Sequence, residues 1–213
     1  MAGFTDYAQN KIRDAFPRGQ AFTPPATLYY ALITASRGER LNSTAYALND
    51  TLVVKIGTKY SMYKCTTAGT SNATLPATYL AVASEAITDG TAVMTEQTVA
   101  LGAGTFVEVS GGAYARASIT ASLANFAGTQ GAASIVASSG VDGSTSNNTA
   151  IAWPAPSGQW HPTGGAIVGV VVLDALTAGN PWHWSLMSAI KNVNNGDAAP
   201  SLPGASWTDK FGD

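Results

Sequence analysis

The sequence feature that most constrains the fold is the stretch at residues 165–188, GAIVGVVVLDALTAGNPWHWSLMS. Residues 167–173 form a short apolar run rich in β-branched side chains, which is typical of a strand buried on both faces. Residues 174–181 combine Asp, Gly, Asn and Pro, which end a strand and favour a turn. Beyond the turn, Trp and Leu alternate with His, Ser and Met, so that Trp182 and Trp184 share one face of a second strand. This pattern predicts a β-hairpin at the centre of an all-β protein.

The composition restricts the partners that such a protein can have. Charged residues make up only 11% of the 213 residues, against about 25% in an ordinary soluble domain. A surface built mainly from Ser, Thr, Asn, Gly and Ala does not repel its neighbours, which suits packing against protein copies. The net charge of -2 and the lack of Lys/Arg clusters argue against nucleic-acid binding. Apolar runs fall short of the roughly 20 residues that cross a bilayer, so no membrane partner is expected.

The N-terminal segment predicts an amphipathic helix over residues 4–16, which Pro17 ends because proline disfavours the helical conformation of the preceding residue. An acid at Asp6 argues against a secretory signal, so we expect the chain to be made and folded in a cytoplasm. The helix either docks on its own sandwich or contacts a neighbouring protein, and the pattern fits both. The candidate partner-contact residues are the apolar residues of one face: Phe4, Tyr7, Ile12 and Phe16.

The rest of the chain predicts two β-units. Residues 1–40 and 108–213 are expected to form an antiparallel, jelly-roll-like β-sandwich, with strands at 27–34 and 113–120 among others. Residues 41–107 are expected to form a small inserted β-domain, because their strand-like runs are separated by turn signals such as Asp-Gly. The Asn-, Gly- and Pro-rich tail after Lys191 is expected to be ordered only by contact with another molecule.

Residues suited to catalysis or metal binding are few and scattered. Cys65 lies in a strand-like run and predicts a small buried hydrophobe rather than a nucleophile. His161 and His183 lack the serine context of a hydrolase, and together with one cysteine they do not have the spacing of a zinc site. The sequence therefore predicts no enzyme activity, no cofactor and no metal. Exposed aromatic rings can stack on sugars, which makes Trp160, Trp182 and Trp184 candidate glycan-contact residues, with core packing as the alternative.

Several short motifs occur in a consistent order along residues 1–35 and 108–190. They are a basic-glycine step after the N-terminal helix, T-P-P-x-x-L-Y-x-A-L-x-T, G-G-x-Y-A-R, an approximate S-N-x-x-x-I-x-(F/W)-P, G-x-W and D-A-x-x-x-G-N, at residues 18–19, 23–34, 111–116, 147–154, 158–160 and 174–180. In this combination the chain resembles the tail-fibre-like virion proteins of tailed bacteriophages.

The inserted region carries a second resemblance. Residues 63–76 fit the pattern Y-x-C-T-T-A-G-T-S-x-A-x-x-P, and residues 88–91 read T-D-G-T. This combination is similar to a small β-module common in phage structural proteins, although Met94 stands where that module usually has a tryptophan.

These resemblances imply a non-enzymatic structural component of a virion, made in a host bacterium. Its partners would be other virion proteins, from the tail or the major capsid protein, and further copies of itself, with a trimer as one candidate. Similar sandwiches also decorate or cement capsids, so a capsid position is an alternative to the tail. A receptor- or glycan-binding tail module is a second alternative.

Overall fold

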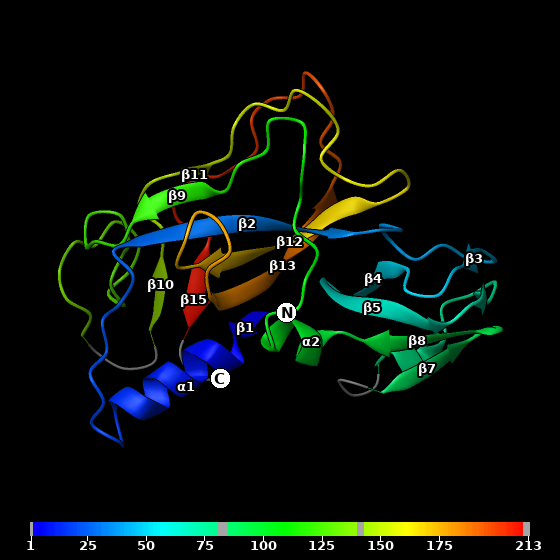
Figure 1. The fold of residues 1–213 in the computed structure, drawn as a ribbon, viewed down its shortest axis with the longest axis horizontal. Coiled ribbons are helices and arrows are strands. Elements are labelled where there is room, and N and C mark those ends of the chain that lie inside the picture. The colour runs from blue at the N-terminus through cyan, green and yellow to red at the C-terminus, as the bar shows by residue number, and fades with distance from the viewer. Residues whose placement is uncertain (1, 81–84, 140–142, 211–213) are drawn as a thin grey trace.

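The computed structural model describes residues 2–80, 85–139 and 143–210, and most of its regular structure is β (Figure 1). The strands of every sheet pair in antiparallel fashion. The predicted all-β, antiparallel class is therefore confirmed, whereas the jelly-roll arrangement stays a prediction. Within the described part of the chain, no helix has the length and apolar character needed to span a bilayer.

A five-stranded sheet occupies the middle of the protein. Its order is β1 (Ala2–Phe4), β13 (Pro181–Lys191), β12 (Ala166–Leu173), β2 (Thr27–Ala35) and β9 (Ala117–Thr120). The hairpin expected from the sequence is the β12–β13 pair, and all eight residues of β12 are buried. A continuous apolar run without alternation has this outcome when both faces of a strand are covered.

Strand β12 separates two hydrophobic cores, because its successive side chains point to opposite faces of the sheet. Val171 and Leu173 belong to the first core, together with Trp184 from β13. Val170 and Val172 belong to the second core, which also contains Trp160. The predicted alternation of the hairpin thus decides which side chains enter each core.

Strand β13 departs from the regular ladder near its end. Gly169 of β12 pairs with Leu186, but Ile167 pairs with Lys191, so one residue of β12 is set against four residues of β13. On its other edge β13 pairs with β1 only at residues 183–185. Residues 187–190 therefore have no Cα partner in either ladder among the described residues, and we call them the β13 excursion.

A second, four-stranded sheet contains β4 (Thr51–Ile56), β5 (Lys59–Thr67), β8 (Ala92–Glu96) and β7 (Ala86–Asp89), in that order. It has a core of its own, in which the rings of Tyr63 and Tyr79 meet edge to face. Its other side chains join the first core of the central sheet: Val53, Tyr60 and Met62. The assignment of residues 41–107 as an independent domain stays a prediction.

Short elements cover the remaining surfaces of the two sheets. The two-stranded ribbons pair β3 (Ala45–Tyr46) with β6 (Gly69–Thr70), β10 (Ser144–Ser146) with β15 (Thr208–Lys210), and β11 (Ile151–Ala152) with β14 (Ser201–Leu202). The 3-10 helix η1 spans Ala77–Leu80 and helix α2 spans Thr98–Gly102.

The C-terminal tail corrects one prediction. Residues after Lys191 were expected to depend on another molecule for their order, but β14 and β15 pair with strands of the same chain. Val193 is buried in the second core, and Leu202 and Trp207 pack against it. Three apolar side chains spread over a polar tail are enough to anchor it, which the overall composition of the tail concealed.

The N-terminal helix is shorter than expected. Helix α1 spans Asp6–Ala15, and Phe4 lies in strand β1 instead. The Thr5 hydroxyl caps the helix by accepting a hydrogen bond from the amide of Ala8 (3.3 Å), and it donates to the carbonyl of Pro181. A single threonine thus begins the helix and ties it to the central hairpin.

The strand expected at residues 113–120 is reduced to β9. Gly112 and Ala113 have φ angles of 54° and 61°, which is left-handed backbone that cannot continue a strand. Earlier in the chain, Glu108 forms an isolated antiparallel bridge with Ile33 of β2.

Candidate functional site

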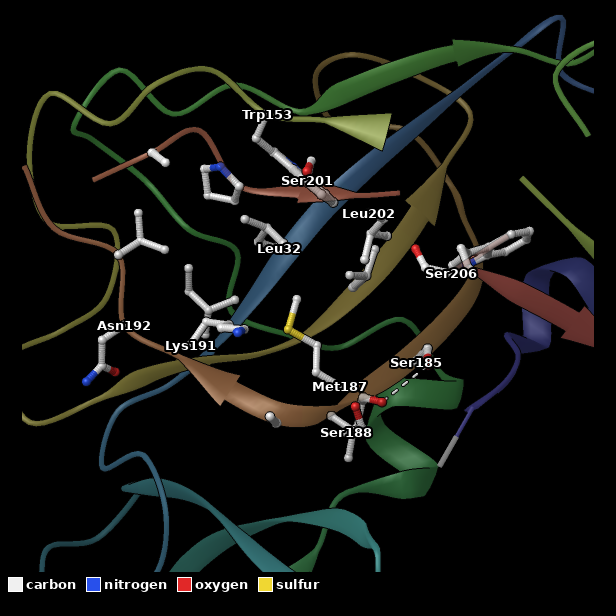
Figure 2. A pocket seen from close by; sticks show the side chains of 18 of the residues that line it. Leu32, Trp153, Ser185, Met187, Ser188, Lys191, Asn192, Ser201, Leu202 and Ser206 are labelled. Atoms are coloured by element: carbon white, nitrogen blue, oxygen red, sulfur yellow. Dashed lines mark hydrogen bonds between the residues drawn. The ribbon is translucent and has the colours of Figure 1, made fainter. Parts of the chain in front are cut away.

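A half-open groove of about 660 Å³ lies beside the second core, between the β13 excursion and the C-terminal tail (Figure 2). Its floor is apolar and comes from three strands or their flanks, with Leu32 of β2, Ile167 and Val170 of β12, and Trp153. Ile167 and Val170 are three residues apart, and they share a face of the sheet because the register of β12 shifts between Ile167 and Gly169.

The two walls of the groove differ in chemistry. One wall is the β13 excursion, in which Ser188 and Ala189 are exposed and Met187 leans toward the floor. The opposite wall is formed by residues 198–208, including Ser201 and Ser206 with their hydroxyl groups. An apolar floor with a hydroxyl rim suits an uncharged, amphipathic ligand rather than an ionic one.

The lining of the groove carries one positive and one negative side chain. Lys191 and Asp197 are the charged members of its lining among the described residues, and Asn192 lies beside Lys191. Their opposite charges leave the groove with no net charge. An occupant therefore gains little from carrying charge itself.

Trp207 also lines the groove. Its indole ring meets the rings of Tyr30 and His183 edge to face, at a centroid distance of 5.7 Å in each case. Phe126 lies on the same indole at 6.1 Å. This arrangement of aromatic rings fixes the tail against the central sheet.

A buried polar cluster lies beneath Trp207. Residues Phe4, His183, Val172 and Tyr30 are consecutive partners across β1, β13, β12 and β2. The Nε2 atom of His183 lies 3.1 Å from Oδ1 of Asp209 in β15. Burial, reinforced by the charge of Asp209, raises the pKa of the Tyr30 hydroxyl well above its ordinary value. The cluster therefore links the first and last strands of the chain through His183.

Three atoms of this cluster are buried without a hydrogen-bond partner in the described part of the chain: Tyr30 Oη, His183 Nδ1 and Trp207 Nε1. Two of them are donors, and the third accepts when Nε2 of His183 carries the proton that faces Asp209. Buried polar atoms of this kind are usually satisfied by internal water. The sequence offered no signal for this cluster, because its members are far apart along the chain.

The four candidate partner-contact residues differ in burial and in the side chains that they contact. Phe4 packs edge to face on His183 (5.5 Å), and Tyr7 packs in the same way on Trp182 (5.3 Å). Ile12 is half-buried, whereas Phe16 is 90% exposed at the end of the helix. Contact of these residues with a partner protein stays a prediction.

The three candidate glycan-contact residues also differ in burial. Trp160 and Trp184 are 2% and 3% exposed, so core packing occupies their rings. The indole N–H of Trp160 donates to the carbonyl of Gly112 (2.7 Å). Trp182 is half-buried, and its indole N–H donates to Asp174 (3.3 Å). Contact with a glycan stays a prediction, for which Trp182 has the most accessible ring of the three.

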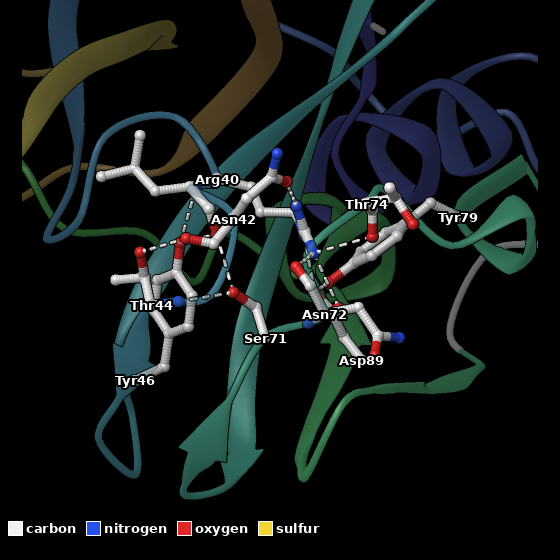
Figure 3. A network of polar contacts seen from close by, with 10 residues as sticks. Arg40, Asn42, Thr44, Tyr46, Ser71, Asn72, Thr74, Tyr79 and Asp89 are labelled. Atoms are coloured by element: carbon white, nitrogen blue, oxygen red, sulfur yellow. Dashed lines mark hydrogen bonds and ion pairs between the residues drawn. The ribbon is translucent and has the colours of Figure 1, made fainter.

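A second polar cluster is built into the four-stranded sheet (Figure 3). The guanidinium group of Arg40 donates to both oxygens of Asp89, at 2.6 and 2.8 Å, and the two side chains are 3% and 0% exposed. Asp89 also accepts from the Asn72 amide and the Tyr79 hydroxyl, each at 2.9 Å. The Asp-Gly pair at residues 89–90 predicted only a tight turn. In the structure, Asp89 of this pair holds three separate segments of the chain through Arg40, Asn72 and Tyr79.

The hydrogen bonds of this cluster set the ionisation of its members. Burial by itself would raise the pKa of Asp89, but the bonds from Arg40, Asn72 and Tyr79 outweigh burial and hold that pKa below its ordinary value. Tyr79 changes in the opposite sense, because burial and the bond to Asp89 raise its pKa. The cluster is an ionised, fully bonded anchor of the fold rather than a poised acid or base.

The G-G-x-Y-A-R motif also holds the fold together. Arg116 donates to both oxygens of Glu108, at 2.9 and 2.7 Å, and to the carbonyls of Ala175 and Ala178, each at 2.7 Å. The Tyr114 hydroxyl donates to Glu108 at 3.0 Å. These bonds tie the β12–β13 turn to the segment before β9, which explains why the motif carries an arginine and a tyrosine.

The residues with catalytic side chains make other contacts. Cys65 is fully buried, and burial together with the charge of Asp50 raises the pKa of its thiol. His161 bonds with Gln159 at 3.1 Å. Over the described ranges, no group of three or more His, Cys, Asp and Glu residues is arranged to hold a metal ion.

Comparison with protein families shows which family this chain matches. A family model described as "Podophage GP4 fiber I protein gp80" matches residues 65–206, which is two thirds of the 213 residues. The matched range begins in β5 and includes the central hairpin and most of the groove. It does not identify a separate inserted module, which stays a prediction. No curated protein matches the chain.

Proposed function

Because the chain belongs to the family of the podophage GP4 fiber I protein gp80, we propose that it is a non-enzymatic structural component of a phage tail fibre. A member of a phage fibre family is a virion component, and its partners are other virion proteins. The finer proposal is that the protein acts by geometry alone, through repeated contacts between symmetric copies.

The observation that carries this proposal is the chemistry of the surface. Large apolar side chains are exposed on several sides of a protein in which only 11% of residues are charged. Those that are more than half exposed are Phe16, Leu41, Leu48, Val99, Val107, Leu123, Ile135, Val136 and Leu176. Scattered apolar groups on a surface without repulsion become buried when subunits pack, and a standard interface buries about 1,600 Å².

The arrangement of the histidines and the cysteine supports a role without catalysis. His183 is bonded to Asp209 under an aromatic cover, and the thiol of Cys65 donates to the carbonyl of Thr67 (3.1 Å). Such groups act as packing and anchoring residues, because a nucleophile needs both access to substrate and a base beside it.

A surface of this chemistry also fits two other roles in a virion. A capsid decoration or cement protein also needs apolar contacts and low charge, but the family description names a fibre, which favours the tail. A receptor- or glycan-binding tail module is favoured by one observation, the half-buried ring of Trp182 beside the exposed turn of the central hairpin.

The test is to find the protein in purified virions and to locate it there. We expect mass spectrometry to detect it in stoichiometric amounts and gold-labelled antibodies to mark only the tail. Label over the whole head would favour the decoration role, and absence of the protein from particles would refute both. Loss of cell or glycan binding in Trp182→Ala, with wild-type particle content, would support the receptor role.

A further inference from the structure

Asn195 differs from the other asparagines of the chain in the residue that follows it. It is the one asparagine in the sequence that precedes a glycine. The side-chain amide of an asparagine can react with the main-chain nitrogen of the next residue, because both groups belong to one short stretch of chain. Glycine leaves that nitrogen open to approach, since it has no Cβ. The local sequence thus favours loss of the side-chain amide at Asn195.

The turn at residues 194–197 exposes both reacting groups. All four of its residues are exposed. The Asp197 amide donates to the carbonyl of Asn194 (3.2 Å), which closes the turn around the Asn-Gly pair. Gly196 has a φ of 82°, and a Cβ built on it would meet nothing within 4 Å. Water and base therefore have access to the turn.

Few hydrogen bonds restrain the two groups. The Gly196 amide donates to the carbonyl of Pro156 at 3.3 Å, against a usual distance of about 2.9–3.0 Å. Among the described residues, the side chain of Asn195 has no hydrogen-bond partner. In contrast, the side chain of Asn147 is fully buried and donates to carbonyls at 2.8 and 2.9 Å. Rotation about the Cα–Cβ bond therefore brings Cγ of Asn195 to the glycine nitrogen, and one long hydrogen bond is lost.

We propose that Asn195 is a site of spontaneous deamidation. Hydroxide removes the proton of the Gly196 amide, and the nitrogen attacks Cγ of Asn195. The N–Cγ bond forms, the Cγ–Nδ2 bond breaks, and ammonia leaves with a proton from water, which regenerates hydroxide. Water then opens the resulting succinimide ring. Opening at Cγ gives aspartate, and opening at the main-chain carbonyl gives isoaspartate, in which the main chain runs through the side chain.

Deamidation changes the turn in two ways. It adds a negative charge two residues from Asp197, which lines the groove and whose carboxylate accepts from the Asn194 amide (2.7 Å). Isoaspartate also lengthens the main chain between two fixed points, since Val193 is buried in the second core and the carbonyl of Pro200 accepts from the Trp153 amide (2.9 Å). The chemistry does not depend on the proposed function, because it needs only water and the turn.

The test incubates the full-length protein in mildly alkaline and in mildly acidic buffer. Trypsin cleaves after Lys191 and Lys210, so residues 192–210 form one peptide. Asn192 and Asn194 are internal controls in the same peptide, because neither precedes a glycine. Tandem mass spectrometry locates each converted asparagine, and isoaspartyl methyltransferase labels the isoaspartate.

Two variants separate the reaction from backbone strain. Gly196→Ala crowds the attacking nitrogen with a Cβ. Gly57→Ala is the matched control, since Gly57 also has a positive φ and its Cβ would likewise meet nothing within 4 Å. Circular dichroism and thermal unfolding establish that both variants are folded.

We expect Asn195 to convert at least about tenfold faster than Asn192 or Asn194, which is about 1.4 kcal/mol in activation free energy. Conversion should be faster in the alkaline buffer, unchanged in Gly57→Ala, and slowed by a similar factor in Gly196→Ala. Equal conversion of the three asparagines, or wild-type conversion in Gly196→Ala, would overturn the inference. An Asn195 that converts in urea but stays intact in the folded protein would also overturn it, because the turn would then protect the amide.

Discussion

Replacing Asp89 with alanine would leave the guanidinium group of Arg40 buried without its counter-charge. The two side chains are 3% and 0% exposed and bond through two pairs of atoms. Alanine would also remove the acceptor of the Asn72 amide and of the Tyr79 hydroxyl. The change therefore leaves one buried charge and two further hydrogen-bond donors without their acceptor.

The magnitude follows from the cost of breaking a buried ion pair on one side, which is about 3–5 kcal/mol. With a urea m-value of about 1–2 kcal/mol/M for a small unit, the midpoint should fall by at least about 1.5 M. Asp14→Ala is the matched control, because its partner Arg18 and Asp14 itself are 71% and 41% exposed. An exposed pair contributes about 1 kcal/mol or less.

The assay benefits from the distribution of chromophores along the chain. All five tryptophans lie after residue 107, whereas Tyr46, Tyr60, Tyr63 and Tyr79 lie in the segment 41–107. Tryptophan fluorescence therefore reports the central sheet, and far-UV circular dichroism reports both sheets. If residues 41–107 are an independent domain, Asp89→Ala should shift only the transition that tryptophan fluorescence does not see.

The pH dependence supplies a second arm of the same test. The folded-state pKa of Asp89 lies below its ordinary value, so its stabilising contribution is complete above about pH 4 and is lost as the pH falls further. Wild type should lose this contribution in acid, and Asp89→Ala should lack that loss. A variant whose midpoint stays within the range of the Asp14→Ala control would refute the reasoning, because the pair would then contribute no more than a surface pair.

Three further predictions concern other parts of the fold. Trp160→Ala should lower the free energy of unfolding, measured by heat or urea, by about 3–5 kcal/mol. The reason is that the change leaves a cavity at a buried site and removes the hydrogen bond from the indole N–H to Gly112. A loss below about 1 kcal/mol would contradict this. Gly90→Ala should destabilise more than Gly57→Ala: both have positive φ, but a Cβ at Gly90 would lie 2.2 Å from a backbone oxygen and at Gly57 would meet nothing. Equal midpoints for the two variants would show that strain alone decides. Burial opposes but does not outweigh the hydrogen bonds that lower the pKa of Asp174, so acid below about pH 4 should change the fluorescence of Trp182, and Asp174→Asn should abolish that change.

The sequence was sufficient for features that depend on local alternation. The central hairpin and the strand β2 follow from their apolar patterns and turn residues, and the structure has them near the expected bounds. The burial of Cys65 follows from the same reasoning. Such patterns are readable because each residue reports only on its own side of a strand.

Reasoning from local pattern failed where the backbone or distant contacts decide the outcome. The expected strand at residues 113–120 is interrupted because Ala113 adopts positive φ, which its side chain does not signal. The tail after Lys191 is polar on average, yet Val193, Leu202 and Trp207 anchor it, and Trp207 packs among three aromatic rings. An average over a segment hides a few large apolar side chains of this kind.

By itself, the sequence determined the all-β class, the central hairpin and the poverty of charge, because all three depend on which residues are present and on their spacing. Only the tertiary structure decided which distant residues meet. It joined Arg40 to Asp89 and His183 to Asp209, and it placed the β13 excursion opposite the tail to form the groove. The physical reason is that burial, pairing and the shape of a groove are properties of segments brought together by folding, and no single segment contains them.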